Sequence, residues 1–358
     1  MRNIVKGLIL VSLLMGCRAE ADFSKDLERI GFLFGAMTQG RVVDSGQNQC
    51  YDTGAVIPCQ DTVYPGQDAD YVGVPKPRSI SAPIQKSNGD LITIDYGTGL
   101  VWTSCPIESV GNPDNTATCA GAPALTDKAT AQSHCSALND RQFGGMTEWR
   151  LPTIRDLRSL LVYVPGGPFY DSSAFPGAVS FQFWSDSVFG GMVVYADFSD
   201  GGIYTTGSSY RVRCVSGPAL QPGNFQLTGG SMVTDNDTGL VFTRCAAGQD
   251  EAGGCAGSPQ LLSWSLALQY CNNLTSGGRQ WRLPAVQELE VTLRPGESPP
   301  VDLTFFPASS GSYWTSTTTP GPGMQAQAVT IIFDAGASHY STTDKTLPTA
   351  AVRCVSGP

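Results

Sequence analysis

Residues 95–105 read DYGTGLVWTSC and residues 235–245 read DNDTGLVFTRC, so the chain contains the same opening motif twice. Each copy continues with two further shared motifs, namely EWRLP (148–152) and RVRCVSGP (211–218), then QWRLP (280–284) and AVRCVSGP (351–358). Each copy is much longer than a solenoid unit of roughly 20–50 residues and is long enough to bury a core of its own. The sequence therefore predicts two tandem domains.

The composition favours turn-rich domains over long helices. The 358 residues include 41 Gly and 24 Pro, only 15% are charged, and the formal net charge is −9. An acidic protein repels nucleic acid and gains no electrostatic attraction to anionic lipid, so we expect no nucleic-acid partner. The same acidic balance argues against binding of a sulfated polysaccharide through charge alone.

The N-terminus has the composition of a secretory signal peptide. Arg2 and Lys6 supply positive charge before an apolar stretch at residues 8–14, which is too short to span a bilayer as a helix. The stretch leads into Leu14-Met15-Gly16-Cys17, which resembles a bacterial lipobox. This resemblance implies cleavage before Cys17 and lipidation of that cysteine. The alternative is an ordinary cleaved signal with a cysteine at this position by coincidence.

Lipidation would place the protein in the bacterial cell envelope, with the membrane as a partner through the acyl chains. In Gram-negative lipoproteins an Asp after the lipidated Cys usually signals retention at the inner membrane, so Arg18 favours the outer membrane. The membrane face, and with it surface exposure, stays open. We expect residues 1–16 to be the signal peptide and residues 17–44 to be a tether.

The eleven cysteines favour five disulfides, because assigning Cys17 to lipid leaves an even number in an exported chain. In each copy the interval between the second and third cysteine is the same, whereas the interval between the first and second differs, which suits a variable hairpin closed by its own bridge. The predicted pairs are Cys50–Cys59, Cys105–Cys119, Cys135–Cys214, Cys245–Cys255 and Cys271–Cys354. With no C-x-x-C pair and only two His, we expect no metal site and no cofactor.

Each copy is predicted to begin with a strand and a helix. A turn-forming Gly precedes the apolar runs at 98–103 and 238–243, which predict strands. The first helix should run from 126 to 138 in the first copy and start at Ser263 in the second. In the second copy we expect Leu266, Tyr270, Cys271 and Leu274 to share the buried face.

A second helix should follow the WRLP motif in each copy. Thr153 to Asp156 resembles a capping box, whereas the second copy has Ala285 at the cap position and should start its helix more weakly. Strands are then expected at 192–198 and 326–333, after a long loop region rich in Gly, Pro and aromatic residues.

The motifs TGLVW, WRLP and RCV together resemble the Lcl C-terminal domain family (DUF1566), which occurs in bacterial envelope and secreted proteins. The resemblance implies one such domain at 91–217 and another at 231–358, with a linker at 218–230. The stretch DSGQNQCYDTGAVIPC is similar to the lead-in often found before this domain, so a disulfide-stapled lead-in segment is expected at 45–90.

The order of elements resembles the C-type-lectin-like fold, in which a cysteine of the first helix pairs with one of the last strand. We therefore expect an α+β protein of two tandem C-type-lectin-like domains, each with two helices, short antiparallel strands, a long loop region and two disulfides. Calcium-dependent lectins carry Glu-Pro-Asn or Gln-Pro-Asp in the long loop, and neither triplet is present. Asn112-Pro113-Asp114 lies inside the first cysteine hairpin and is expected to be a turn.

Aromatic residues of the long loop regions are the candidate ligand contacts, because exposed aromatics stack on sugars or fill partner pockets. The candidates are Tyr170, Phe183, Trp184, Tyr313 and Trp314. The alternative is that they form the core of the loop region itself. For the Trp and Arg of both WRLP motifs we expect structural roles, with the Trp in the core and the Arg paired to a loop carboxylate.

The expected function is non-catalytic binding or adhesion outside the cell, with a glycan or protein as ligand. Two copies would allow bivalent binding. The WRLP segment also resembles formylglycine-generating enzymes, so an enzyme relative of that type is one alternative. We expect no enzyme activity, because each cysteine of the two copies has a structural partner in the predicted pairing. A structural envelope component without a soluble ligand is the second alternative.

Overall fold

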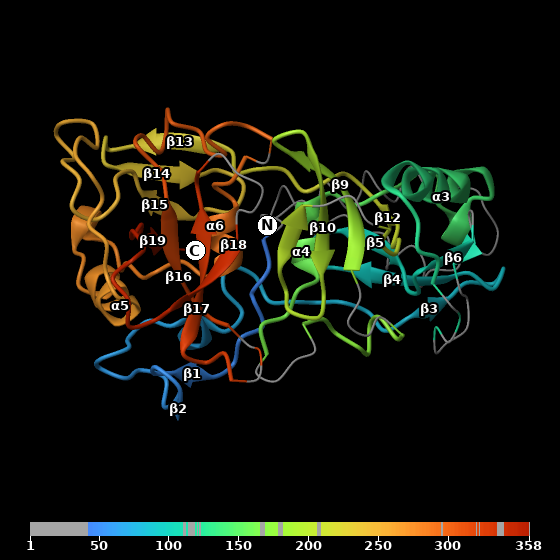
Figure 1. The fold of residues 1–358 in the computed structure, drawn as a ribbon, viewed down its shortest axis with the longest axis horizontal. Helices are drawn as coiled ribbons and strands as arrows, with labels where there is room; N and C mark the ends of the chain where they lie inside the picture. The colour runs from blue at the N-terminus through green and yellow to red at the C-terminus, as the bar shows by residue number, and fades with distance from the viewer. Residues whose placement is uncertain are drawn as a thin grey trace, which may run out of the picture.

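A computed structural model describes most of the chain after residue 41. The described residues are 42–109, 112–113, 119, 121, 123–164, 169–177, 182–205, 209–294, 296–319, 321, 323–334 and 340–357. The two repeats lie side by side, and each is a mixed α+β body with short helices and small antiparallel sheets (Figure 1). Among the described residues, no helix combines the length and apolar character that spanning a bilayer requires.

The first repeat is built on a five-stranded antiparallel sheet with a three-stranded sheet beside it. The larger sheet has the order β3 (Ile84–Gln85), β4 (Leu91–Asp95), β5 (Leu100–Thr103), β12 (Val215–Ser216), β8 (Trp149–Arg150). The smaller sheet has the order β11 (Ile203–Thr205), β10 (Met192–Asp197), β9 (Gln182–Phe189). The helical elements are α3 (Lys128–Asp140), η2 (Phe143–Gly145) and α4 (Ile154–Ser159). The expected strands at 98–103 and 192–198 contain β5 and β10.

The second repeat has the same plan. Its first sheet has the order β13 (Phe225–Thr228), β14 (Met232–Asp235), β15 (Val241–Thr243), β19 (Val355–Ser356). Its second sheet has the order β16 (Ser312–Thr318), β17 (Gln327–Ile332), β18 (Tyr340–Asp344). The helical elements are α5 (Trp264–Asn272), η3 (Ser276–Gly278) and α6 (Val286–Glu290). The expected strands at 238–243 and 326–333 contain β15 and β17.

The shared opening motif forms a turn that one aspartate holds. Asp95 accepts hydrogen bonds from the backbone N–H groups of Gly97 and Thr98 and from the Thr98 hydroxyl. In the second copy Asp235 accepts from the Thr238 hydroxyl in the same way. The following Gly99 and Gly239 have φ values of 74° and 77°, a left-handed conformation that glycine adopts without steric cost. This turn leads directly into β5 and β15.

Two long-range disulfides fasten the first helix of each repeat to its closing strand. Cys135 on α3 bonds to Cys214, and Cys271 on α5 bonds to Cys354, each with a Cα–Cα distance of 5.4 Å. All five disulfides of the structure join the pairs expected from the cysteine spacing, the others being Cys50–Cys59, Cys105–Cys119 and Cys245–Cys255. The short bridge of the first copy closes the hairpin of β6 (Ile107–Ser109) and β7 (Asn112–Pro113). Asn112 and Pro113 therefore form the strand β7, which pairs with β6, and not the expected turn. Asp114 lies outside the described residues.

The first helices begin at the expected caps, but the buried face of α5 differs from the prediction. Asp127 caps α3 by accepting a hydrogen bond from the Thr130 backbone N–H. On α5 the residues that face the core are Trp264, Ala267, Leu268 and Cys271. Leu266 is 50% exposed and Tyr270 is 37% exposed, so the expectation that both are buried is wrong. The Trp264 indole N–H donates to the Thr315 carbonyl inside the core, which fixes the helix in this rotation.

The capping box that starts α4 is present in the structure. The Thr153 hydroxyl accepts from the Asp156 backbone N–H, and the Asp156 carboxylate accepts from the Thr153 backbone N–H. At α6 the Glu288 carboxylate accepts from the Ala285 backbone N–H, but Ala285 has no side-chain acceptor to return the bond. The start of α6 is therefore stabilised by only one of the two hydrogen bonds of a capping box.

The two repeats share one large apolar core. It joins side chains of the first repeat, such as Leu157 and Phe175, to side chains of the second, such as Leu289 and Phe306. Each repeat also has a smaller core of its own beneath its first helix. Residues 218–230, expected as a linker, are part of the folded body, because Leu220 is buried in the shared core and β13 begins within this range.

The lead-in segment 45–90 crosses from one repeat to the other (Figure 1). At the second repeat, the Gln47 side chain exchanges hydrogen bonds with the backbone of Thr318. At the first repeat, β3 adds a strand to the edge of β4. Folded structure already begins at the end of the expected tether, where Val43 is buried and the Asp44 carboxylate accepts from the Gly73 N–H. Residues 17–41 lie outside the described residues.

A buried ion pair crosses the contact between the repeats. The Arg158 Nε atom donates to the Glu290 carboxylate at 2.9 Å, and both side chains are almost fully buried. Arg158 also donates to the Tyr163 hydroxyl at 2.8 Å, and its guanidinium lies 3.6 Å from the centre of the Tyr340 ring. These contacts bind α4 of the first repeat to α6 and β18 of the second.

Breaking this pair on one side should destabilise the whole protein. We expect Arg158→Met to lower the free energy of unfolding by about 3–5 kcal/mol, because it leaves the Glu290 carboxylate buried without its partner. The double variant Arg158→Met with Glu290→Leu should recover much of that loss, since it removes both charges. Urea unfolding of the three proteins checks this. Equal stability of Arg158→Met and the parent protein would contradict the prediction.

Candidate functional site

The five aromatic residues expected to contact a ligand are instead part of the interior. Tyr170, Phe183, Trp184, Tyr313 and Trp314 are each at most 4% exposed. The Trp184 indole N–H donates to the Thr126 carbonyl and the Trp314 indole N–H donates to the Leu262 carbonyl. The expectation of exposed contacts is therefore wrong at all five positions. The alternative reading, in which these residues form the core of the loop regions, matches the structure.

The WRLP motifs have structural roles. Trp149 and Trp281 are buried, and their indole N–H groups donate to carbonyls of the preceding turns, at Phe143 and Ser276. Arg150 pairs with Asp156 at 2.7 Å. The equivalent Arg282 pairs with Glu288 through both guanidinium nitrogens. The partner of each Arg is thus the carboxylate in the first turn of the following helix, not a loop carboxylate as expected.

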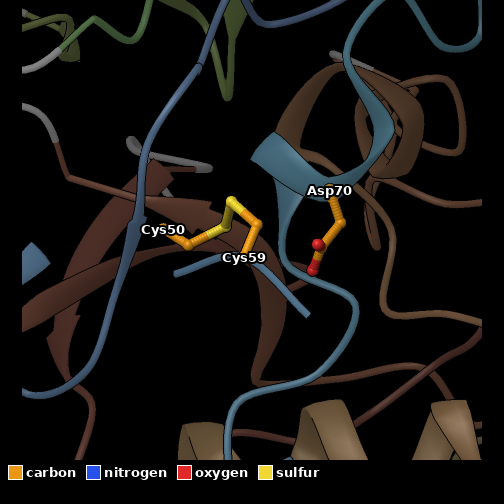
Figure 2. A group of neighbouring side chains, drawn as sticks. All are labelled: Cys50, Cys59 and Asp70. Carbon is orange, nitrogen blue, oxygen red and sulfur yellow. A yellow bond between two sulfur atoms is a disulfide. The ribbon is translucent and has the colours of Figure 1, made fainter. Parts of the chain in front are cut away.

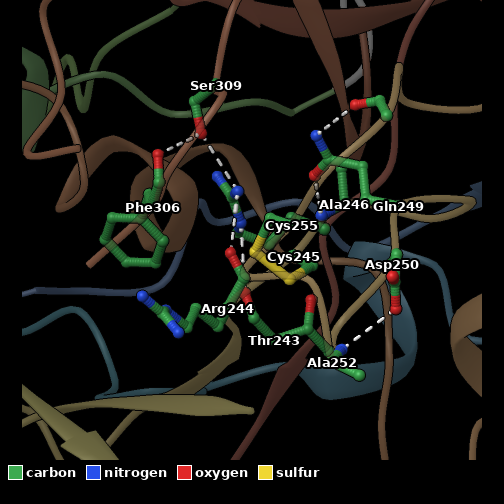
Figure 3. Close-up of a disulfide and its surroundings, with 12 residues drawn as sticks. Thr243, Arg244, Cys245, Ala246, Gln249, Asp250, Ala252, Cys255, Phe306 and Ser309 are labelled. Atoms are coloured by element: carbon green, nitrogen blue, oxygen red, sulfur yellow. Dashed lines mark hydrogen bonds between the residues drawn. A yellow bond between two sulfur atoms is a disulfide. The ribbon is translucent and has the colours of Figure 1, made fainter. Parts of the chain in front are cut away.

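A second arginine, one residue before the last cysteine of each copy, also stabilises the fold. Arg353 is fully buried and donates to the carbonyls of Thr243 and Arg244. These two residues lie next to the Cys245–Cys255 bridge (Figure 3). In the first copy Arg213 donates to the carbonyls of Thr103 and Ser104 in the same way. Burial lowers the pKa of Arg213 to about 9. The final RCV motif therefore supports the first hairpin of each copy.

Among the described residues, the most exposed aromatic side chains are Tyr204 of the first repeat, 39% exposed, and Tyr270 of α5 in the second repeat, 37% exposed. Only Tyr204 belongs to a stack of tyrosines that reaches back to the core. We call Tyr195, Tyr204 and Tyr210 the tyrosine row. The ring centroids of Tyr195 and Tyr210 lie 4.0 Å apart, and those of Tyr195 and Tyr204 lie 5.6 Å apart, with neighbouring planes tilted by about 30°. Tyr204 at the outer end is 39% exposed, while Tyr210 at the inner end packs on Trp184. The row thus extends from the core to the surface across β10 and β11.

Hydrogen bonds hold the outer end of the row. The Tyr204 hydroxyl donates to Asp200 at 2.6 Å. Burial, together with this nearby carboxylate, raises the pKa of Tyr204 well above its usual value, so the hydroxyl stays protonated as a donor. The outer end of the row therefore presents a partly exposed aromatic ring beside a carboxylate, and contact surfaces for sugars and proteins use this combination of groups.

The second repeat has no such row among its described residues. Strand register makes Thr330 the counterpart of Tyr195. Tyr195 pairs with Trp184 of β9, Thr330 pairs with Trp314 of β16, and each Trp is the third residue of its strand. By the same comparison, Ser341 corresponds to Tyr204 and Ala350 corresponds to Tyr210. The sequence signal for the row was therefore a difference between the copies, whereas the prediction relied on the aromatic residues of the long loop regions.

Two cavities lie against the lead-in segment. One of about 570 Å³ lies between the lead-in and the end of α5, with polar walls that include Gln60, Asp61, Asp70, Asn272 and Asn273. Another of about 620 Å³ lies between the lead-in and the first repeat, next to Arg78, Val162 and Tyr170. The lead-in had been expected only as a stapled segment, and its contribution of cavity walls was missed.

The Cys50–Cys59 bridge and Asp70 lie close together at one of these walls (Figure 2). The two sulfur atoms are bonded to each other and offer no thiolate to a metal ion. The Asp70 carboxylate accepts hydrogen bonds from the backbone N–H groups of Gln60 and Gln67. This group therefore fixes the lead-in and has no character of a metal site.

Two titratable residues have shifted pKa values where the lead-in meets the second repeat. Burial raises the pKa of Asp68 from 3.8 to about 7, against the effect of a 2.5 Å hydrogen bond from the Thr317 hydroxyl. Burial lowers the pKa of Lys345 from 10.5 to about 7. The Lys345 Nζ atom lies 4.1 Å from the centre of the Trp264 ring and donates to the Asp52 carbonyl.

The model of the Lcl C-terminal domain matches this chain twice, at residues 91–216 and 231–356. The two matches cover most of the chain, so the protein belongs to the Lcl C-terminal domain family and carries two tandem copies of that domain. No curated protein matches the chain.

The raised pKa of Asp68 predicts a fall in stability as the pH rises. Between its ordinary value of 3.8 and about 7, Asp68 keeps its proton in the folded state and loses it in the unfolded state. Stability should therefore decrease with pH across this window, by at most about 1.4 kcal/mol per pH unit from this group. Lys345 has the opposite effect: between a pH of about 7 and 10.5 it is protonated only in the unfolded state, so stability should increase with pH in this range.

Urea unfolding of the parent protein and of Asp68→Asn at several pH values tests this. The variant should lose the decrease between pH 3.8 and about 7, because an amide does not titrate. The dependence of stability on pH above this window, which arises from Lys345, should be the same in both proteins and serves as the internal control. Parallel stability curves for the two proteins across the acid window would refute the assignment.

Proposed function

We propose that this protein is a non-catalytic binding protein of the bacterial cell envelope, exported and anchored through lipid on Cys17. Its ligand is an extracellular glycan or protein, and the tyrosine row of the first repeat is the contact surface. The observation that carries this proposal is the row itself, because its outer member Tyr204 is exposed beside Asp200, whereas the five aromatic residues expected from the sequence are buried.

The chemistry of the row suits an adhesive contact. Tyrosine contributes a large contact area with little loss of side-chain freedom, and its hydroxyl provides a hydrogen bond at the rim. Val188 and Met192, near the turn between β9 and β10, are also exposed, so the sheet that carries the row has further apolar surface. Such a surface needs no positive charge, in agreement with the net charge of −9.

The C-type-lectin-like fold is part of this proposal. The bridge from the first helix to the closing strand, present in both copies, is the feature that supports it. Because the row exists in the first repeat and its counterparts in the second are Thr330, Ser341 and Ala350, we propose one such contact surface per chain. The chain then carries one tyrosine row, in place of two equivalent rows.

The alternative of a formylglycine-generating enzyme needs reactive thiols. All ten cysteines in the described part of the chain are in disulfides, which supports the non-catalytic proposal. For the alternative of an envelope component without a soluble ligand, no particular contact surface is required, and the tyrosine row would then have no role outside the fold.

Exchanging the row for the residues of the second repeat tests the proposed function. We expect Tyr195→Thr with Tyr204→Ser to weaken ligand binding by at least about tenfold, since removal of central aromatic contacts costs roughly 2 kcal/mol or more at such surfaces. A glycan array and a pulldown with extracellular proteins, both on the mature chain, provide the ligand and the measurement.

The matched control is Ser341→Ala, at the corresponding position of the second repeat, which should leave binding unchanged. Thermal unfolding of each variant separates loss of contact from loss of fold. A well-folded double variant that binds like the parent protein would exclude the row, and the absence of any ligand in both assays would exclude the function.

A further inference from the structure

The cavity between the lead-in segment and the end of α5 has walls that the fold holds in place. The Gln269 side chain donates to the Val63 carbonyl at 2.8 Å, which ties α5 to the lead-in. The Asp61 carboxylate accepts from the N–H groups of Val63 and Tyr64, and Asp70 accepts from Gln60 and Gln67. The Cys50–Cys59 bridge closes the same segment. These polar groups shape the rim, and they already form hydrogen bonds within the fold.

Other polar side chains around the cavity are available to a ligand. In the part of the chain that the structure describes, the side-chain amides of Gln60, Asn272 and Asn273 form no hydrogen bond, and all three residues are exposed. Each amide offers two N–H donors and a carbonyl acceptor. The cavity of about 570 Å³ is within the range of roughly 300–1,000 Å³ that is typical of small-molecule sites. The walls thus offer several unused donors and acceptors around a space large enough for a small ligand.

The charge around the cavity limits the ligand class. Of the described residues that line it, none is Lys, Arg or His, and two are Asp. Asn272 is the last residue of α5, so the negative end of the helix dipole is also at this wall. An anionic ligand such as a sulfate ester, a phosphate or a uronate would therefore be repelled. A neutral ligand with many hydroxyl groups can use both the donors and the acceptors of the amides.

We propose that this cavity binds a neutral polyhydroxylated ligand, namely a single uncharged sugar residue. Asn272, Asn273 and Gln60 hydrogen-bond the sugar hydroxyls, and Tyr71 forms an apolar part of the wall. The Tyr71 ring is held by Arg282, whose guanidinium lies 4.6 Å from the ring centre and is paired with Glu288. The site belongs to the second repeat and the lead-in, so it is separate from the tyrosine row and does not depend on the proposed function.

The first repeat shows why this site occurs once. Counting from the equivalent Cys135 and Cys271, the positions of Asn272 and Asn273 are occupied by Ser136 and Ala137 in α3. The Ser136 hydroxyl donates to the Gln132 carbonyl of its own helix and is therefore already used. The amides are a feature of the second copy, placed where the lead-in supplies the opposite wall.

Ligand-observed NMR and calorimetric titration on the mature chain test the proposal. The probes are the methyl glycosides of glucose, galactose, mannose and N-acetylglucosamine, with methyl glucuronide and glucosamine as charged comparisons. We expect at least one neutral glycoside to bind and methyl glucuronide not to bind. The variant Asn272→Ser with Asn273→Ala, which installs the residues of the first repeat, should weaken that binding by about tenfold, as expected for the loss of two hydrogen bonds.

Tyr195→Thr is the control that should leave glycoside binding unchanged, which separates this site from the tyrosine row. Because Asn272 and Asn273 are exposed, their substitution should not change the thermal unfolding temperature. The proposal is overturned if no neutral glycoside binds, if a charged probe binds better than every neutral one, or if the amide variant binds like the parent protein.

Discussion

The apolar core shared by the two repeats is the constraint on which most of this structure depends. Side chains from α4 and from α6 meet there, and the buried contact of Arg158 with Glu290 crosses the same region. Because burial of apolar area is the main source of stability, neither repeat can separate without exposing a large part of its core. The lead-in segment adds hydrogen bonds to both repeats and completes one body from three parts of the chain.

Features that depend on local sequence could be predicted. The cysteine intervals gave the disulfide pairs, and the Thr153–Asp156 spacing gave a capping box, because each involves a short-range pattern or one that the duplication repeats. The buried face of α5 could not be predicted from hydrophobicity alone, since the exposed Leu266 is as apolar as the residues that do face the core. Trp264, at the start of the helix, decides the rotation through a partner 51 residues away.

The candidate site was harder to predict for a related reason. Aromatic residues of the long loop regions were expected to meet a ligand, but they are buried and form part of the core. The features that reach the surface are those in which the copies differ, such as Tyr195 against Thr330 and Asn272 against Ser136. The duplicated fold thus provides the scaffold, while divergence between its halves and the position of the lead-in give each half a different surface.

The most direct test of this account is differential scanning calorimetry of the mature chain with its disulfides intact. If the shared core and the lead-in make one cooperative body, a single transition should appear, with the calorimetric enthalpy equal to the van't Hoff enthalpy. Two resolved transitions, or a calorimetric enthalpy about twice the van't Hoff value, would show that the repeats unfold independently and would contradict the account.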